Sequence, residues 1–129
     1  VPPASLGAAK LLVAPEHHGV QTSGWQTPWG TKYGAVTFDL GEPRIVHSVV
    51  LSLWGVVETG PNFWRIQRGL GPDGAFNDIH KGPLDPRHTQ AEAVLHYPGR
   101  YFAIHFYAGR SANTAAVRRV SFYSTPVSL

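Results

Sequence analysis

The feature that most constrains this chain is the regular interruption of its apolar residues by glycine and proline. The 14 Gly and 11 Pro divide 129 residues into segments too short for the helices of a bundle. Within several segments, apolar side chains recur at every second residue, which is the period of a strand with one buried face. The sequence therefore predicts an all-β fold.

Two segments show this alternation clearly, residues 35–40 and residues 101–107. The first is followed by a turn signal at Gly41-Glu-Pro43. In both segments the polar residues fall on the opposite face, so we expect half-buried strands. Their predicted inward residues are Val36, Phe38, Leu40, Phe102, Ile104 and Phe106.

Weaker signals predict further strands, each bounded by Gly, Pro or polar residues. These are residues 10–14, 45–54, 63–68, 76–80, 91–97 and 117–123. In the second of them Ile45, Val49, Leu51 and Leu53 are expected on the inward face, and in the third Trp64 and Ile66. Residues 16–33 show no period and are expected to form a long loop. Together, these predicted strands indicate an eight-stranded antiparallel β-sandwich of jelly-roll type.

The length and composition indicate one domain. With 43% hydrophobic and 15% charged residues, the chain can bury a single core without a metal or disulfide. We expect residues 1–9 to be a linker or N-terminal extension and residues 10–129 to be the folded module. The chain contains no cysteine, which excludes disulfides and thiol chemistry, and no apolar run near the roughly 18 to 20 residues of a membrane span.

Five short motifs in order resemble the discoidin superfamily, also described as coagulation factor 5/8 C-domain-like or galactose-binding-like. Taken together they extend from about residue 10 to residue 124. They are Thr22-Ser-Gly-Trp-Gln-Thr27, Val36-Thr-Phe-Asp-Leu-Gly41, Phe63 to Gly74, Gly99-Arg-Tyr-Phe-Ala-Ile104 and Val117 to Tyr123. The resemblance implies an eight-stranded sandwich used as an appended binding module.

Many bacterial members of this fold are family 32 carbohydrate-binding modules, so the resemblance implies a non-catalytic module that binds a sugar unit of a glycan or polysaccharide. Such modules hold sugars at loops on one end of the sandwich. The chemistry suits loops, because a pyranose ring stacks on an aromatic plane while its hydroxyls need polar partners. The resemblance further implies an extracellular or cell-envelope protein of several domains. The alternative is a discoidin domain for protein interaction, adhesion or lipid surfaces.

The four tryptophans receive different predictions. Trp25 aligns with a buried Trp of the family and is expected to cover the core, and Trp64 is expected within it. Trp29 lies between turn residues, and Trp54 has the parity of outward-facing Ser48 and Ser52. We therefore predict that Trp29 and Trp54 are exposed ligand platforms.

In the family topology the loops at residues 16–33, 54–62 and 108–115 gather at one end of the sandwich. Their polar side chains are candidate ligand partners. The predicted set is His17, His18, Glu58, Asn62, Arg110 and Asn113. The outer sheet face that carries Arg65, His105 and Tyr107 is the next candidate.

Several other partners are not expected. The net charge is +3, but the basic residues are scattered and do not form the stripe that nucleic acid requires. The seven His lack the spacing of a zinc motif, and residues 15–33 contain no Asp, so neither a histidine metal site nor tightly held calcium is expected. No cofactor is expected. No nucleophile motif or evident carboxylate pair points to an enzyme.

Overall fold

The structure is a computed structural model that describes residues 21–71 and 73–127, with side chains described from residue 26 onward. These residues contain six strands and one short 3-10 helix. The strands are β1 (Gln21–Gln26), β2 (Tyr33–Ser52), β3 (Pro61–Gly69), β4 (Phe76–Pro83), β5 (Gln90–Ala108) and β6 (Ala116–Pro126), and the helix η2 is Val57–Thr59. All pairings are antiparallel, in the order β1-β6-β2-β5-β3-β4.

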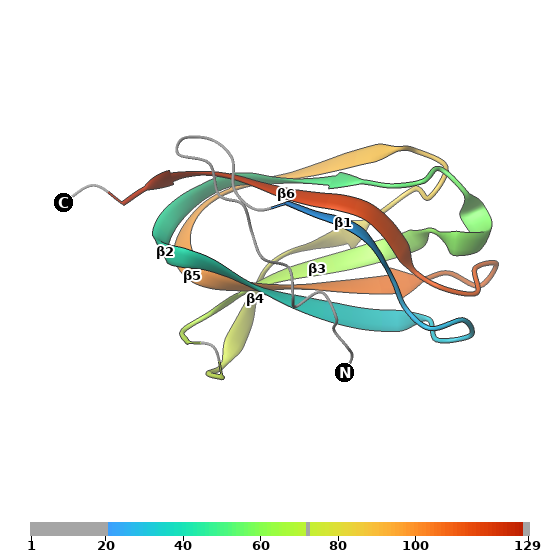
Figure 1. Cartoon of the computed structure of the whole chain (residues 1–129), viewed down its shortest axis with the longest axis horizontal. Helices are drawn as coiled ribbons and strands as arrows, with labels where there is room; N and C mark the ends of the chain where they lie inside the picture. Colours follow the sequence, from blue (N-terminus) through green and yellow to red (C-terminus); the bar gives the residue numbers. More distant parts are fainter. Residues whose placement is uncertain (1–20, 72, 128–129) are drawn as a thin grey trace.

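The two long strands β2 and β5 each take part in both layers of the sandwich (Figure 1). The first part of β2 pairs with the second part of β5, which continues to β3 and β4. Beyond residue 44, β2 pairs with the first part of β5 and with β6, which continues to β1. The result is one hydrogen-bonded sheet folded over a core, as the sequence predicted for an all-β sandwich.

The predicted turn at residues 41–43 is instead a bend within β2. Gly41 has a φ of 89°, and its N–H donates to Asp39 Oδ1 at 2.8 Å. The Asp39 carboxylate also accepts from Arg100 Nε of β5 at 2.7 Å. The strand therefore changes direction without ending, and segments 35–40 and 45–54 belong to one strand.

The predicted count of eight strands is not reproduced in the described residues. Segments 91–97 and 101–107 also join into one strand, β5. The segment at residues 10–14 lies outside the described residues. In addition, the predicted loop at residues 16–33 was wrong at residues 21–26, which form β1 and pair with β6, whereas residues 27–32 are a loop as expected.

One inward residue was also assigned wrongly in β2. Val46 is fully buried, whereas Ile45 is only half-buried. A shift of register between Val46 and Ser48 reverses the alternation at this point, so Val46 and Val49 both face the core. The other predicted inward residues of this segment, Leu51 and Leu53, are buried as expected.

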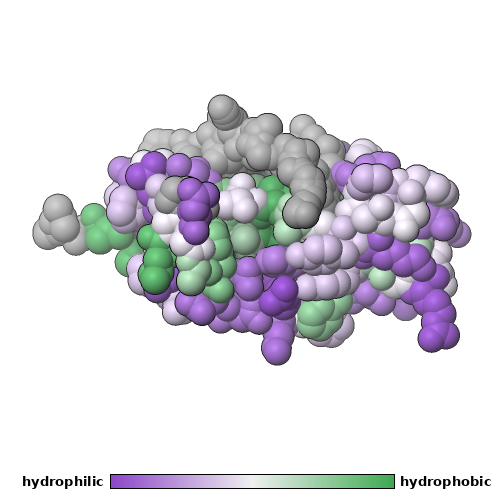
Figure 2. All heavy atoms as spheres, turned by 90° about the horizontal axis from the view of Figure 1, so that it is seen from below, coloured by the Kyte–Doolittle hydropathy of each residue, from purple (hydrophilic) through white to green (hydrophobic). Residues whose placement is uncertain are grey.

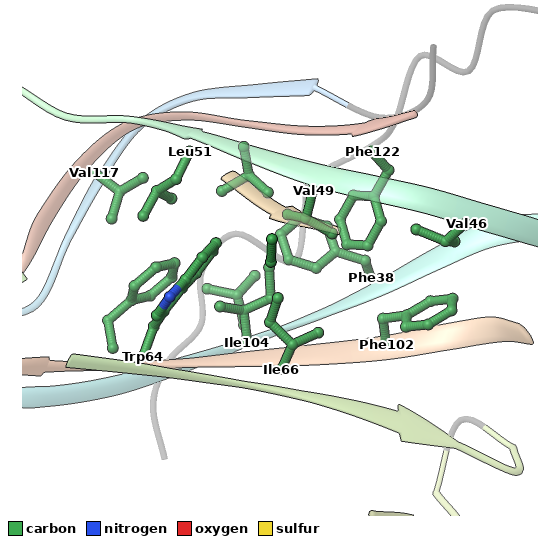
Figure 3. Packing of buried hydrophobic residues seen from close by; sticks show 14 of the residues in the cluster. Phe38, Val46, Val49, Leu51, Trp64, Ile66, Phe102, Ile104, Val117 and Phe122 are labelled. Atoms are coloured by element: carbon green, nitrogen blue, oxygen red, sulfur yellow. The ribbon is translucent and has the colours of Figure 1, made fainter. Parts of the chain in front are cut away.

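The core lies between the layers and is rich in aromatic rings (Figure 3). Phe122 of β6 lies 5.0 Å from Phe38 and 5.7 Å from Phe102, measured between ring centroids. Trp64 is buried, as predicted from its parity with Ile66. Within the described ranges, no helix is long and apolar enough to cross a membrane.

Candidate functional site

Three of the connecting segments meet at the end of the sandwich opposite the bends of β2 and β5 (Figure 1). The backbone N–H of Gly30 donates to the carbonyl of Asn113 at 2.7 Å, and the N–H of Asn113 donates to the carbonyl of Glu58 at 2.9 Å. These bonds tie together the segments at residues 27–32, 54–60 and 109–115. The gathering of loops predicted from the family topology is thus present in the described residues.

Two buried threonines fix the position of the first of these loops. Thr27 and Thr114 lie with their hydroxyl oxygens 2.7 Å apart, and Thr114 Oγ1 donates to the Thr27 carbonyl at 2.6 Å. Thr27 Oγ1 also contacts the Thr31 carbonyl oxygen at 2.6 Å, which closes the loop on itself. The loop that carries Trp29 therefore has a defined conformation before any ligand is bound.

A fourth loop, residues 84–89, joins this end and was not included in the predicted site. The Leu84 N–H donates to the Asn62 carbonyl at 2.8 Å, and the Leu53 N–H donates to the Thr89 carbonyl at 2.9 Å. A Cβ on Gly60 would lie only 2.4 Å from Pro86 Cβ, so glycine is what allows these two loops to touch.

A pocket of about 320 Å³ opens between these loops. It has the size of a small-ligand site. Two of the predicted residues, Asn62 and Arg110, line it, together with Asp85 and Arg87 from the fourth loop. The full lining is Val57, Gly60, Asn62, Asp85, Pro86, Arg87, Gly109, Arg110, Ser111 and Ala112. The pocket therefore combines a partly apolar wall with polar side chains from β3, from the loop at residues 84–89 and from the segment at residues 109–115.

The charged groups of the pocket differ in how they are paired. Arg87 Nε and Nη2 each contact an oxygen of Asp85 at 3.0 Å. The Arg87 side chain and backbone lower the pKa of Asp85 to about 2, so this carboxylate stays ionised and accepts hydrogen bonds. Arg110 makes no ion pair among the described residues. Its guanidinium is therefore available to a ligand.

Both predicted aromatic platforms are exposed. Trp29 is 68% exposed on the loop tied to Asn113, and Trp54 is 54% exposed two residues beyond the end of β2. The Trp54 ring lies under the guanidinium of Arg118 at 5.5 Å, a cation–π contact that orients it. Neither ring lines the pocket described above.

The remaining predicted residues fall into two groups. Glu58 and Asn113 hold the loops together through their backbones and expose their side chains. His17 and His18 lie outside the described residues, as does the side chain of Trp25. Their predicted roles remain predictions.

The alternative face, the outer side of β2, β5, β3 and β4, carries a connected polar network. Seen from below, the molecule shows hydrophilic residues interspersed with smaller hydrophobic patches (Figure 2). His105 Nδ1 contacts Tyr33 Oη at 2.6 Å, and His105 Nε2 contacts Gln67 Oε1 at 2.7 Å. Asp78 accepts from Gln67 at 2.9 Å and from Arg65 at 3.0 Å, and Arg65 Nε donates to Tyr107 Oη at 3.1 Å.

The network fixes one tautomer of His105. Gln67 Nε2 donates to the carboxylate, so its Oε1 must accept from His105 Nε2, which leaves Nδ1 to accept from the Tyr33 hydroxyl. A proton added to Nδ1 would disturb this chain of bonds. Burial lowers the pKa of His105, and the nearby Arg65 lowers it further. The face is thus organised around a neutral imidazole.

This arrangement predicts a loss of stability in mild acid. In the unfolded chain a histidine has a pKa of about 6.5. Below that pH the unfolded state binds a proton that folded His105 resists, so the free energy of unfolding falls as the pH drops. Burial also lowers the pKa of His80, which acts in the same direction. Urea unfolding at about pH 7.5 and about pH 5.5 measures the loss.

Two variants check the assignment of this pH dependence. His105→Gln should reduce it, because the titrating group is gone. His88→Gln serves as the control; it removes an exposed imidazole whose Nε2 lies 3.7 Å from Asp85 Oδ2 and which is far from the network of His105 in sequence and contacts. A pH dependence that is equal in His105→Gln and the parent chain would contradict the role given to His105.

The sequence matches no family model and no curated protein. Solved structures do match. They include the family 32 carbohydrate-binding module of C. perfringens NanJ in complex with galactose, at 16% identity and a TM-score of 0.64, covering 78% of this chain and 75% of that one. The C. perfringens module CpGH89CBM32-5, in complex with GalNAc-β-1,3-galactose, matches at 11% identity and a TM-score of 0.68. That match covers 78% of this chain and 74% of the module's chain.

This chain has the fold of a family 32 carbohydrate-binding module. A truncated AlyQ with CBM32 and alginate lyase domains also matches, at 17% identity and a TM-score of 0.62. That match covers 81% of this chain but only 27% of the AlyQ chain, which carries a catalytic domain as well. The discoidin-like resemblance found in the sequence is therefore confirmed at the level of the fold.

Proposed function

We propose that this domain is a non-catalytic carbohydrate-binding module whose ligand sits at the loop end. The observation that carries the proposal is the pocket formed by three loops and β3, with Asn62, Arg110 and the ion pair of Asp85 and Arg87 in its wall. The named ligands of the similar modules, galactose and GalNAc-β-1,3-galactose, support a sugar as the ligand class.

The chemistry of the pocket fits sugar hydroxyls. A hydroxyl can accept from Arg110 or from the amide of Asn62 while it donates to the ionised Asp85. The exposed Trp29 on the neighbouring loop offers an apolar plane for the C–H face of a ring. The backbone bonds between the loops hold these groups in place, so binding need not order the loops first.

A glycan array followed by calorimetry with the best sugar tests this proposal. Trp29→Ala and Trp54→Ala are each expected to weaken binding about ten- to a hundredfold, the equivalent of about 1 to 3 kcal/mol. Both rings are exposed, so their loss should leave the melting temperature nearly unchanged. Trp25→Ala, predicted to remove a buried ring, should instead lower the melting temperature.

The outcomes separate the alternatives. Binding to anionic vesicles or to protein partners, with no glycan bound on the array, would favour a lipid-surface, adhesion or protein-interaction domain and overturn the proposal. Normal glycan binding by both Trp29→Ala and Trp54→Ala would show that the binding site does not lie at the loop end. In that case the outer face with Arg65, His105 and Tyr107 becomes the candidate.

We further propose that the module acts as part of a larger extracellular or cell-envelope protein. The AlyQ structure supports this, because its CBM32 domain occurs in one chain with an alginate lyase domain. In such a chain the module would bind the glycan while a separate domain performs catalysis. Nucleic acid, membrane and cofactor are not part of the proposal.

A further inference from the structure

Two histidines from different strands face each other near the bends of β2 and β5, far from the loop end. His47 of β2 and His96 of β5 have their Nδ1 atoms 3.5 Å apart. Their ring centroids are 5.6 Å apart with an interplanar angle of 67°. His47 is half-buried and His96 is exposed, so the space between the two nitrogens is reachable from solvent.

A hydroxyl on the neighbouring strand β6 orients His47. Its Nε2 lies 3.0 Å from Thr125 Oγ1 of β6. In the tautomer in which Nε2 donates to this oxygen, the lone pair of Nδ1 is directed at His96. Histidines that bind metals are usually held in this way, with the other ring nitrogen donating to a neighbouring group.

The backbone at His96 is unusual, which also indicates a functional role for the histidine pair. His96 has a φ of 53°, the only positive value among the described non-glycine residues. It lies in an irregularity of β5, where Val46 pairs with Tyr97 but Ser48 pairs with Val94. Such bulges redirect a side chain, and a positive φ is uncommon for a residue other than glycine, although histidine adopts it more readily than most.

From these three observations we propose that His47 and His96 form a binding site for Zn²⁺. Imidazole nitrogen is a preferred ligand of this ion. Two Zn–N bonds of about 2.0 to 2.1 Å at a tetrahedral angle place the nitrogens about 3.3 to 3.4 Å apart, close to the 3.5 Å found here. The spacing therefore fits Zn²⁺.

The protein supplies only two ligands. In the described ranges, no group of three or more His, Cys, Asp or Glu side chains comes together. Waters or donors from another molecule would have to occupy the other two positions of the tetrahedron, one more than in a catalytic zinc site with three protein ligands. Because the pair lies at the opposite end from the pocket, this proposal is independent of the proposed function.

Calorimetric titration of the whole chain with Zn²⁺ tests the site. We expect one ion per chain, with binding at least about tenfold weaker in His47→Gln and in His96→Asn. Asn is chosen at position 96 because it tolerates a positive φ. Thr125→Val keeps both ligands but removes the orienting hydroxyl, and should weaken binding about ten- to a hundredfold.

One control addresses the two adjacent histidines at positions 17 and 18. His17 and His18 are replaced together by Gln, and this variant should bind Zn²⁺ as the parent chain does. Zn²⁺ should also raise the melting temperature of the parent chain but not that of His96→Asn. Loss of binding only in the variant at positions 17 and 18, equal binding by His96→Asn and the parent, or no binding below about 1 mM would each overturn the proposal.

Discussion

Phe122→Ala is expected to lower the free energy of unfolding by about 3 to 5 kcal/mol. Its ring is fully buried between Phe38 and Phe102, so truncation leaves a cavity bordered by both layers. Domains of this size are stable by only about 5 to 15 kcal/mol, so the loss is a large share of the total. Denaturant unfolding followed by fluorescence measures it.

Trp29→Ala is the matched control for this variant. It removes a larger aromatic side chain, but one that is 68% exposed. The two variants therefore separate the loss of an aromatic ring from the loss of a buried one. A midpoint for Phe122→Ala that equals the midpoint for Trp29→Ala would contradict the core described here.

Arg110→Ala is expected to reduce glycan affinity about ten- to a hundredfold, because hydrogen bonds from a charged donor contribute about 1.5 to 3 kcal/mol. Arg110 lines the pocket and has no ion-pair partner among the described residues. Its removal should therefore affect the ligand more than the fold. Calorimetry with the sugar identified on the array gives the affinity, and a thermal melt checks the fold.

Arg119→Ala is the corresponding control. Arg119 is also exposed but lies on β6, outside the lining of the pocket. It tests whether a general loss of positive charge weakens binding. Equal losses in the two variants would show that the effect is electrostatic at long range and that Arg110 has no special contact.

Much of the fold could be predicted from local patterns. Alternation in residues 35–40 and 101–107 identified six core residues correctly, because a strand with one buried face imposes a period of two. The exposure of Trp29 and Trp54 followed from turn residues and parity. The edge strand β1 was missed, because Gln21-Thr-Ser-Gly-Trp-Gln26 has no alternation and is defined by its pairing with β6.

The parts that the sequence did not reveal depend on contacts between distant residues. Asp85 and Arg87 enter the pocket because loop 84–89 touches Gly60, a contact with no local signal. His47 and His96 are 49 residues apart, so a search for short histidine spacings cannot find them. Registers and bulges in the sheet determine both arrangements.

The bonds that join the loops at Gly30, Asn113 and Glu58 run between main-chain groups, which every residue type except proline can supply in full. The outward side chains at these loops can therefore be exchanged without moving the loops. This makes the end of the sandwich a suitable place for a combinatorial library. Varying positions 29, 58, 110 and 113 together should yield new sugar preferences on an unchanged scaffold, with Thr27, Thr114 and Gly60 kept constant.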